Sequence, residues 1–367
     1  MEECIEMDKN KRQSNIELLR ILAMCGVIIL HYNNATIGGG LAYARGINLY
    51  ILYCFESLFA CAVNLFVLIS GYFMCTKPKR TLDKPFELLI QVILCDECFY
   101  LVSVFLHHKP INAKHIFGRL VPANWFVILY ITLYVVSPFL NMIIEKIENC
   151  GMFKRGVTIL ILLFSVYPTF VDVLAELTHK QYVGLSSVGM YGSQWGYSIV
   201  NFCLMYMIGA YLRLHPDMSG RAKHGVRIFV GIIVLTVWAL VNNKIGFETE
   251  RTAWEYCNPL VIFMAVEIFK IFSKINIGQR KLINQLAEAT FIVYLMHNKF
   301  LKYLHIPQFV SEMPIVMILH IIISVLIIYA ICMIVYLGYS KSIAKILSVI
   351  YNRFSIFKKD IFNEEWR

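Results

Sequence analysis

Charge and long polar segments are scarce in this sequence. Charged residues make up 16% of its 367 residues, against about a quarter in an ordinary soluble domain. Hydrophobic residues make up 58%, and no loop between the apolar runs is long enough to form a domain. These features exclude an ordinary soluble protein and predict an all-α protein that crosses a membrane many times.

Acidic residues are fewer than basic ones, which leaves a net charge of +10. The basic residues are spread over short loops, so we expect no nucleic-acid partner. The eleven cysteines are an odd number that lies mostly inside apolar runs, which argues against a disulfide framework. Cys95 and Cys98 form a C-x-x-C pair, but Asp96 and Glu97 lie between them in a hydrophobic run. We therefore predict no metal site.

The apolar runs predict about ten transmembrane helices. They lie near 16–36, 49–74, 86–106, 122–144, 157–175, 195–212, 226–243, 254–273, 284–304 and 313–338. Most basic residues fall in the segments that are cytoplasmic if the N-terminus is cytoplasmic. The sequence therefore predicts an even number of helices, with both termini in the cytoplasm.

Three regions follow from this topology. We expect a cytoplasmic tail over 1–15, a membrane domain over 16–338 and a basic amphipathic cytoplasmic tail over 339–367. In the last region, Ile343 and Ile350 fall on one face of a helix whose other face is polar, which is typical of a helix lying at a membrane surface.

The first apolar run contains an arginine and a histidine, Arg20 and His31. Eleven positions at about 100° per residue bring them to within about 20° of one face, and roughly 16 Å apart. Glu17 can reach Arg20 as an i,i+3 partner. Ionisable side chains at this depth are costly and usually face a wet cavity. The alternative is a positive-inside anchor arginine with a histidine near the outer interface.

Four other side chains reach the depth of His31 in this topology: Glu56, Asn124, Trp125 and His297. An unpaired carboxylate in lipid costs roughly 2.5–3.5 kcal/mol, so we predict that Glu56 contacts His31 as the orienting partner of a base. Trp125 also fits an aromatic belt, and His297 also fits an interfacial histidine.

A group of basic residues surrounds the cytoplasmic end of the predicted site. Arg20 lies within the helix, and the loop Lys77-Pro-Lys79-Arg80 follows the second run. Such a group of basic side chains favours binding of an anionic ligand that carries phosphates.

Several motifs resemble one known family. Arg20 and His31, then Asn64-LFVLISGYFM, Asn124-WFVILY and Ala289-TFIVYLMHN, are similar to motifs of the acyltransferase-3 family of membrane O-acyltransferases. The resemblance covers about 16 to 338. Where the family often has an aspartate three residues before the arginine, this chain has Glu17, and the basic pair of the family near helix 3 is only approximated around Arg80.

The resemblance implies an enzyme that moves an acyl group, usually acetyl, from cytoplasmic acyl-coenzyme A to a hydroxyl of a surface glycan or its lipid-linked precursor. It implies that Arg20 and His31 are essential. We add Glu56 and His297 as catalytic candidates. For coenzyme A we expect Arg20, Glu17 and Arg80, and for the acceptor Asn124 and Trp125. We expect the bacterial cytoplasmic membrane as its location; the oligomeric state stays open.

The alternative is a glycan or small-molecule transporter or flippase that uses His31 and Glu56 as a proton relay. Such proteins are often built from repeated halves with interrupted helices, and we find no internal repeat in the sequence. A dependence on coenzyme A discriminates between the two functions.

Overall fold

The computed structural model describes residues 12–77, 79–106, 108, 110, 113–147, 150–180, 182–185, 194–246, 251–354 and 360. Residues 1–11 of the predicted N-terminal tail, and 355–359 and 361–367 of the predicted C-terminal tail, therefore lie outside the described residues. Within the described ranges the chain forms helices and loops, with no β-strand, and the all-α prediction is confirmed.

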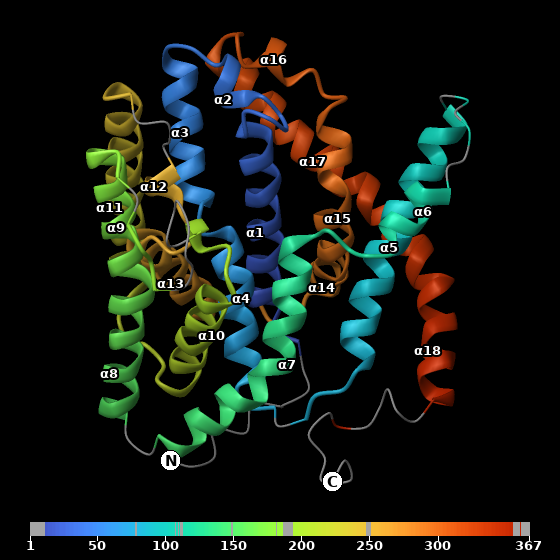
Figure 1. Ribbon diagram of the computed structural model, residues 1–367, viewed down its shortest axis with the longest axis horizontal. Coiled ribbons are helices and arrows are strands. Elements are labelled where there is room, and N and C mark those ends of the chain that lie inside the picture. Colours follow the sequence, from blue (N-terminus) through green and yellow to red (C-terminus); the bar gives the residue numbers. More distant parts are fainter. Residues whose placement is uncertain are drawn as a thin grey trace.

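The helices pack side by side as one bundle (Figure 1). They are α1 (Ser14–Asn33), α2 (Gly40–Tyr43), α3 (Ile47–Phe59), α4 (Ala62–Met74), α5 (Asp83–Leu106), α6 (Ala113–Arg119), α7 (Trp125–Lys146), α8 (Cys150–Ile161), the π-helix η1 (Leu162–Val166), α9 (Tyr167–Thr178), the 3₁₀ turn η2 (Gln194–Gly196), α10 (Ile199–Leu214), α11 (Arg221–Lys244), α12 (Arg251–Trp254), α13 (Pro259–Ser273), α14 (Lys281–Glu288), α15 (Thr290–Leu301), α16 (Ile306–Phe309), α17 (Pro314–Lys341) and α18 (Ile343–Arg353).

Within the described residues, 8 helical stretches are long and apolar enough to cross a membrane. Each predicted apolar run contains helix, but α10 has only 16 residues and the run near 284–304 is divided into α14 and α15. The chain is thus a multi-pass membrane protein, while the number of crossings stays a prediction. The start of α1 and the end of α18 lie at the same end of the bundle (Figure 1), as an even number requires.

The crossing of α4 and α10 depends on two glycines. A Cβ atom on Gly71 would lie 2.2 Å from the backbone oxygen of Tyr206, and one on Gly209 would lie 2.2 Å from the backbone oxygen of Leu68. Small residues let helix backbones approach closely in membrane bundles. Gly71 belongs to the Ser-Gly-Tyr motif of the second apolar run, so that motif has a packing role here.

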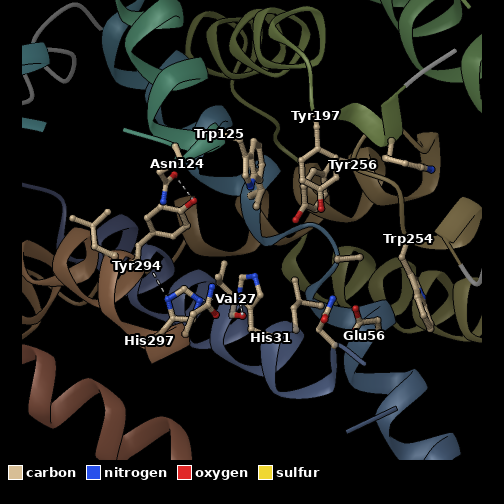
Figure 2. A pocket seen from close by; sticks show the side chains of 18 of the residues that line it. Val27, His31, Glu56, Asn124, Trp125, Tyr197, Trp254, Tyr256, Tyr294 and His297 are labelled. Atoms are coloured by element: carbon tan, nitrogen blue, oxygen red, sulfur yellow. Dashed lines mark hydrogen bonds between the residues drawn. The ribbon is translucent and has the colours of Figure 1, made fainter. Parts of the chain in front are cut away.

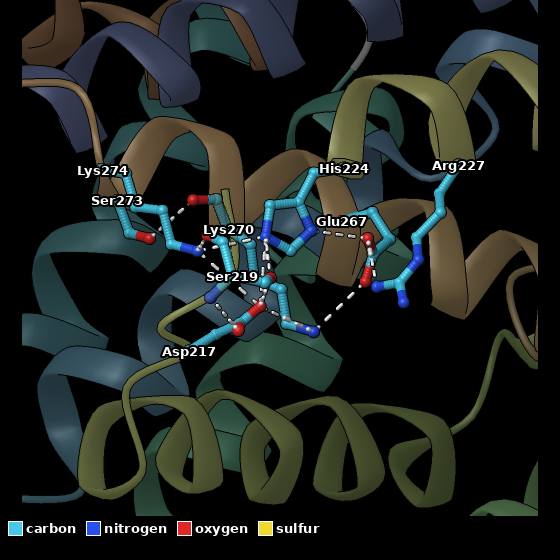
Figure 3. A network of polar contacts seen from close by, with 8 residues as sticks. All are labelled: Asp217, Ser219, His224, Arg227, Glu267, Lys270, Ser273 and Lys274. Carbon is cyan, nitrogen blue, oxygen red and sulfur yellow. Dashed lines mark hydrogen bonds and ion pairs between the residues drawn. The ribbon is translucent and has the colours of Figure 1, made fainter. Parts of the chain in front are cut away.

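A polar network surrounds the buried side chain of His224 (Figure 3). His224 of α11 is fully buried between two carboxylates, with Nδ1 2.7 Å from Glu267 Oε2 and Nε2 3.1 Å from Asp217 Oδ2. Lys270 contacts both carboxylates, at 3.2 and 3.5 Å. The backbone N–H of Ser219 donates to Asp217 and holds the pKa of that carboxyl well below its ordinary value. The network ties the α10–α11 loop to α11 and α13.

The last helix, α18, corresponds to the predicted amphipathic segment. Leu347 is buried against the bundle, whereas Ile346, Ile350 and Phe354 are exposed. The helix is confirmed. Its position at a membrane surface stays a prediction, and the exposed apolar side chains are the ones that lipid would cover.

We expect Gly71→Ala to destabilise the fold, because the new methyl group would collide with the backbone of α10. Overpacking of this kind costs about 1–3 kcal/mol. The measurement is the midpoint temperature at which detergent-solubilised protein loses its monodisperse peak on heating, which should fall. Gly156→Ala in α8 is the matched control, because nothing lies within 4 Å of its Cβ position. Equal midpoints for the two variants would contradict the packing role of Gly71.

Candidate functional site

Two histidines from distant parts of the chain meet inside the bundle. His31, in the last turn of α1, and His297 of α15 are joined by a contact of 2.7 Å between His31 Nδ1 and His297 Nε2. Their ring centroids are 4.7 Å apart. His297 is 1% exposed and His31 is half-buried, and both rings border one cavity.

The hydrogen bonds around the rings assign their protons. His297 Nδ1 lies 2.7 Å from the backbone oxygen of Tyr294, and His31 Nδ1 lies 3.0 Å from that of Val27. Carbonyl oxygens only accept, so both Nδ1 atoms carry protons. The Nδ1–H of His31 also donates to His297 Nε2, which must then be an unprotonated acceptor. In neutral His31 the lone pair is therefore on Nε2.

Glu56 lies in the same cavity as His31 and hydrogen-bonds a neighbouring side chain of α1. The His31 ring hydrogen-bonds His297 through its Nδ1 atom, and the predicted contact of His31 with Glu56 stays a prediction. The orientation of α1 about its own axis directs Nδ1 of His31 toward the backbone oxygen of Val27 and toward His297 of α15. Glu56 Oε2 accepts from Nδ2 of the buried Asn33, at 2.8 Å.

The cavity in front of the histidines has a volume of about 1080 Å³. One wall is aromatic: the Trp125 ring lies 4.4 Å from that of Tyr197 and is stacked 6.1 Å from that of Tyr256, measured between centroids. Figure 2 shows this wall facing His31 and His297, with Glu56 beyond His31. The polar side chains of the lining are Asn34, Glu56, Asp96, Asn124, Glu255, Asn298 and Lys299. Apolar faces with a few polar groups are typical of a small-molecule site.

Asn124 lines this cavity and also supports it. Its side-chain oxygen accepts from the backbone N–H of Val127, at 3.2 Å, and so caps the first turn of α7. The same oxygen accepts from the hydroxyl of Tyr294, at 2.9 Å. The predicted substrate residue is thus engaged in joining α7 to α15.

A second cavity, of about 280 Å³, adjoins the first. Its walls include Phe66, Phe126 and Phe291, and it extends to Arg20 and Glu288. Both cavities are lined by the same three residues, namely Val27, Val63 and Tyr294. Arg20 and His31, which share one stripe of α1, therefore border two cavities that meet between them.

Arg20 forms a salt bridge with Glu17, the partner that the sequence predicts. Its Nη1 atom donates to the two carboxylate oxygens of Glu17, at 2.9 and 3.1 Å. Its side chain is still 32% exposed, and the guanidinium lies 5.8 Å from the centre of the Phe73 ring. A guanidinium with part of its surface open retains donors for an anionic group.

Arg80 is placed differently from the prediction. It is 2% exposed, and its guanidinium donates to Ser137 Oγ and to the backbone oxygens of Met74, Lys77 and Lys79. Carbonyl oxygens at the end of a helix such as α4 need donors of this kind. A contact of Arg80 with coenzyme A would require these bonds to break, so the geometry favours a structural role for it.

Several lining residues were missed by the sequence analysis. Three of them are aromatic residues at the ends of apolar runs, namely Tyr197, Trp254 and Tyr256. In the sequence, the only feature that marks these positions is the local excess of aromatic residues. Asp96, which lies in an apolar run, pairs with Lys299 at 3.3 Å. Among the residues that the structure describes, no three His, Cys, Asp or Glu side chains gather as metal ligands.

Comparison with known proteins identifies one family. The model of the acyltransferase-3 family, described as an acyltransferase domain, matches residues 13–337. Neither the curated proteins nor the solved structures include a significant match. Because the family match covers nearly the whole chain, the protein belongs to the acyltransferase-3 family and is a membrane acyltransferase.

Proposed function

We propose that the protein is an O-acyltransferase that moves an acetyl group from cytoplasmic acetyl-coenzyme A to a hydroxyl of a cell-surface glycan or its lipid-linked precursor. The cell membrane of a bacterium is the proposed location. The observation that carries the proposal is the pair of adjoining cavities, with Arg20 on the smaller one and the His31–His297 pair on the larger one.

The donor would enter from the side of Arg20. Its phosphates would bind the exposed part of the guanidinium, since charge-assisted hydrogen bonds to phosphate are strong and suit arginine. The narrow arm of coenzyme A would then lie in the smaller cavity, against Phe66, Phe126 and Phe291. The separation of Arg20 and His31 along α1, roughly 16 Å, is of the length that such an arm spans.

His31 would act as the general base. Its Nε2 would take the proton of the acceptor hydroxyl while the hydroxyl oxygen attacks the thioester carbon. The new C–O bond forms, the C–S bond breaks, and the proton passes from Nε2 to the leaving sulfur to give free coenzyme A. His297 Nε2, which accepts from His31 Nδ1, would orient the ring and stabilise its charged form.

The larger cavity would hold the acceptor. A sugar ring presents C–H groups on its faces and hydroxyls around its edge. The aromatic wall of Trp125, Tyr197 and Tyr256 would pack against the faces of the ring. Glu56 and the other polar side chains of the lining would hydrogen-bond the hydroxyls. This combination supports a glycan as the acceptor.

The first test compares histidine variants in inverted membrane vesicles supplied with radiolabelled acetyl-coenzyme A. We expect His31→Ala to abolish the transfer of label to glycolipid. His297→Leu should lower kcat by about 10²–10⁴-fold with little change in KM, because the base loses its orienting acceptor. Label and released coenzyme A are both measured, at equal protein amounts.

His320→Gln is the control for the histidine variants, because His320 contacts Tyr32 and Phe309 and lies outside the lining of both cavities. It should transfer label at the wild-type rate. A fully active His297→Leu would contradict the paired mechanism. A folded wild type that neither binds nor uses acetyl-coenzyme A would contradict the proposed donor.

A second test concerns the donor end. Arg20→Ala should raise KM for acetyl-coenzyme A by roughly 10- to 100-fold, because a hydrogen bond to a charged group contributes about 1.5–3 kcal/mol. The rise of KM with salt should also become weaker. Arg45→Ala is the control, since Arg45 donates only to the nearby carbonyls of Ala42 and Ala44 in the described contacts. Unchanged KM and salt dependence in Arg20→Ala would exclude Arg20 from the donor site.

A further inference from the structure

Three side chains lie where the two cavities of the site meet. Val27 of α1, Val63 of α4 and Tyr294 of α15 line both cavities, and we call them the partition. Val27 precedes His31 by four residues, and Tyr294 precedes His297 by three, so each lies one helical turn from a histidine. The partition is therefore the boundary that any group must cross between the smaller cavity and the histidine pair.

The surroundings of the partition hold it rigidly. Val27 and Val63 are both buried, and a valine side chain on a helix has one strongly preferred rotamer. The Tyr294 hydroxyl donates to Asn124 Oδ1 at 2.9 Å, and its ring packs 5.1 Å from that of Phe126, measured between centroids. The width of the passage therefore depends on the sizes of these three side chains.

The cavities on the two sides of the partition differ in chemistry. The smaller one has mainly apolar walls, which also include the hydroxyls of Ser70, Tyr130 and Thr290, and its charged residues are Arg20 and Glu288. The larger one presents carboxylates and amides among its aromatic rings, Glu56 and Asn298 among them. An apolar chain that crossed the partition would exchange apolar walls for partly polar ones.

We propose that Val27, Val63 and Tyr294 set the size of the acyl group that the protein can transfer. This inference rests on the proposed acyltransferase function, because it requires a donor that arrives from the Arg20 side. The acyl group is the leading end of such a donor and must pass the partition before its carbonyl carbon reaches His31. An acetyl group brings one methyl group through the passage, whereas a longer acyl group brings a chain.

The experiment widens the passage and changes the donor. Val63→Ala and Val27→Ala are each assayed in inverted membrane vesicles with radiolabelled acetyl-, butanoyl- or hexanoyl-coenzyme A, and label in the glycolipid fraction gives kcat/KM. We expect the hexanoyl-to-acetyl ratio of kcat/KM to rise about tenfold in both variants, the scale at which pockets discriminate hydrocarbon groups. Val63→Leu narrows the passage and should lower the butanoyl-to-acetyl ratio.

Val67→Ala is the matched control. Val67 lies one turn after Val63 on α4, is completely buried and lines neither cavity, so its removal should leave both ratios at the wild-type value. Unchanged ratios in Val63→Ala and Val27→Ala, with acetyl transfer retained, would overturn the role of the partition and leave the proposed function intact. A wild type that uses none of the three donors would overturn both.

Discussion

The hydrogen bond between His31 and His297 joins the first helix of the bundle to one that lies 266 residues later in the chain. Polar rings inside an apolar bundle are stable only where each ring nitrogen that carries a proton finds an acceptor. The carbonyl oxygens one turn earlier on α1 and α15, together with the partner ring, meet that need. The position of α1 among α3, α4, α13, α14, α15 and α17 is what brings the two rings together.

Much of the site could be predicted from the sequence because the position of a residue along a transmembrane helix largely fixes its depth in the membrane. A helix rises by a fixed amount per residue, so the topology alone placed Glu56, Trp125 and His297 at the level of His31. All of them line one cavity in the structure. The pairing of Glu17 with Arg20 was equally predictable, because a spacing of three residues on a helix settles it without tertiary information.

Rotation about the helix axis and lateral packing could not be predicted in this way. Whether His31 meets Glu56 or His297 depends on which neighbour its Nδ1 faces, and that follows from how α1 and α15 are turned toward each other. Arg80 shows the same limit. Its position in a basic loop suggested a ligand for phosphate, whereas the free carbonyl oxygens at the end of α4 hold its guanidinium inside the protein.

The partition also bears on how an acyltransferase could avoid hydrolysing its own donor. A base such as His31 Nε2 activates water as readily as a sugar hydroxyl, so a thioester that waits beside it in a wet cavity is at risk. The smaller cavity has mainly apolar walls, and the partition lies where it meets the larger one. In the proposed reaction the thioester stays among apolar side chains until it crosses the partition, and an acceptor that fills the larger cavity displaces the water there. The same three side chains that limit acyl size would then also limit wasteful hydrolysis.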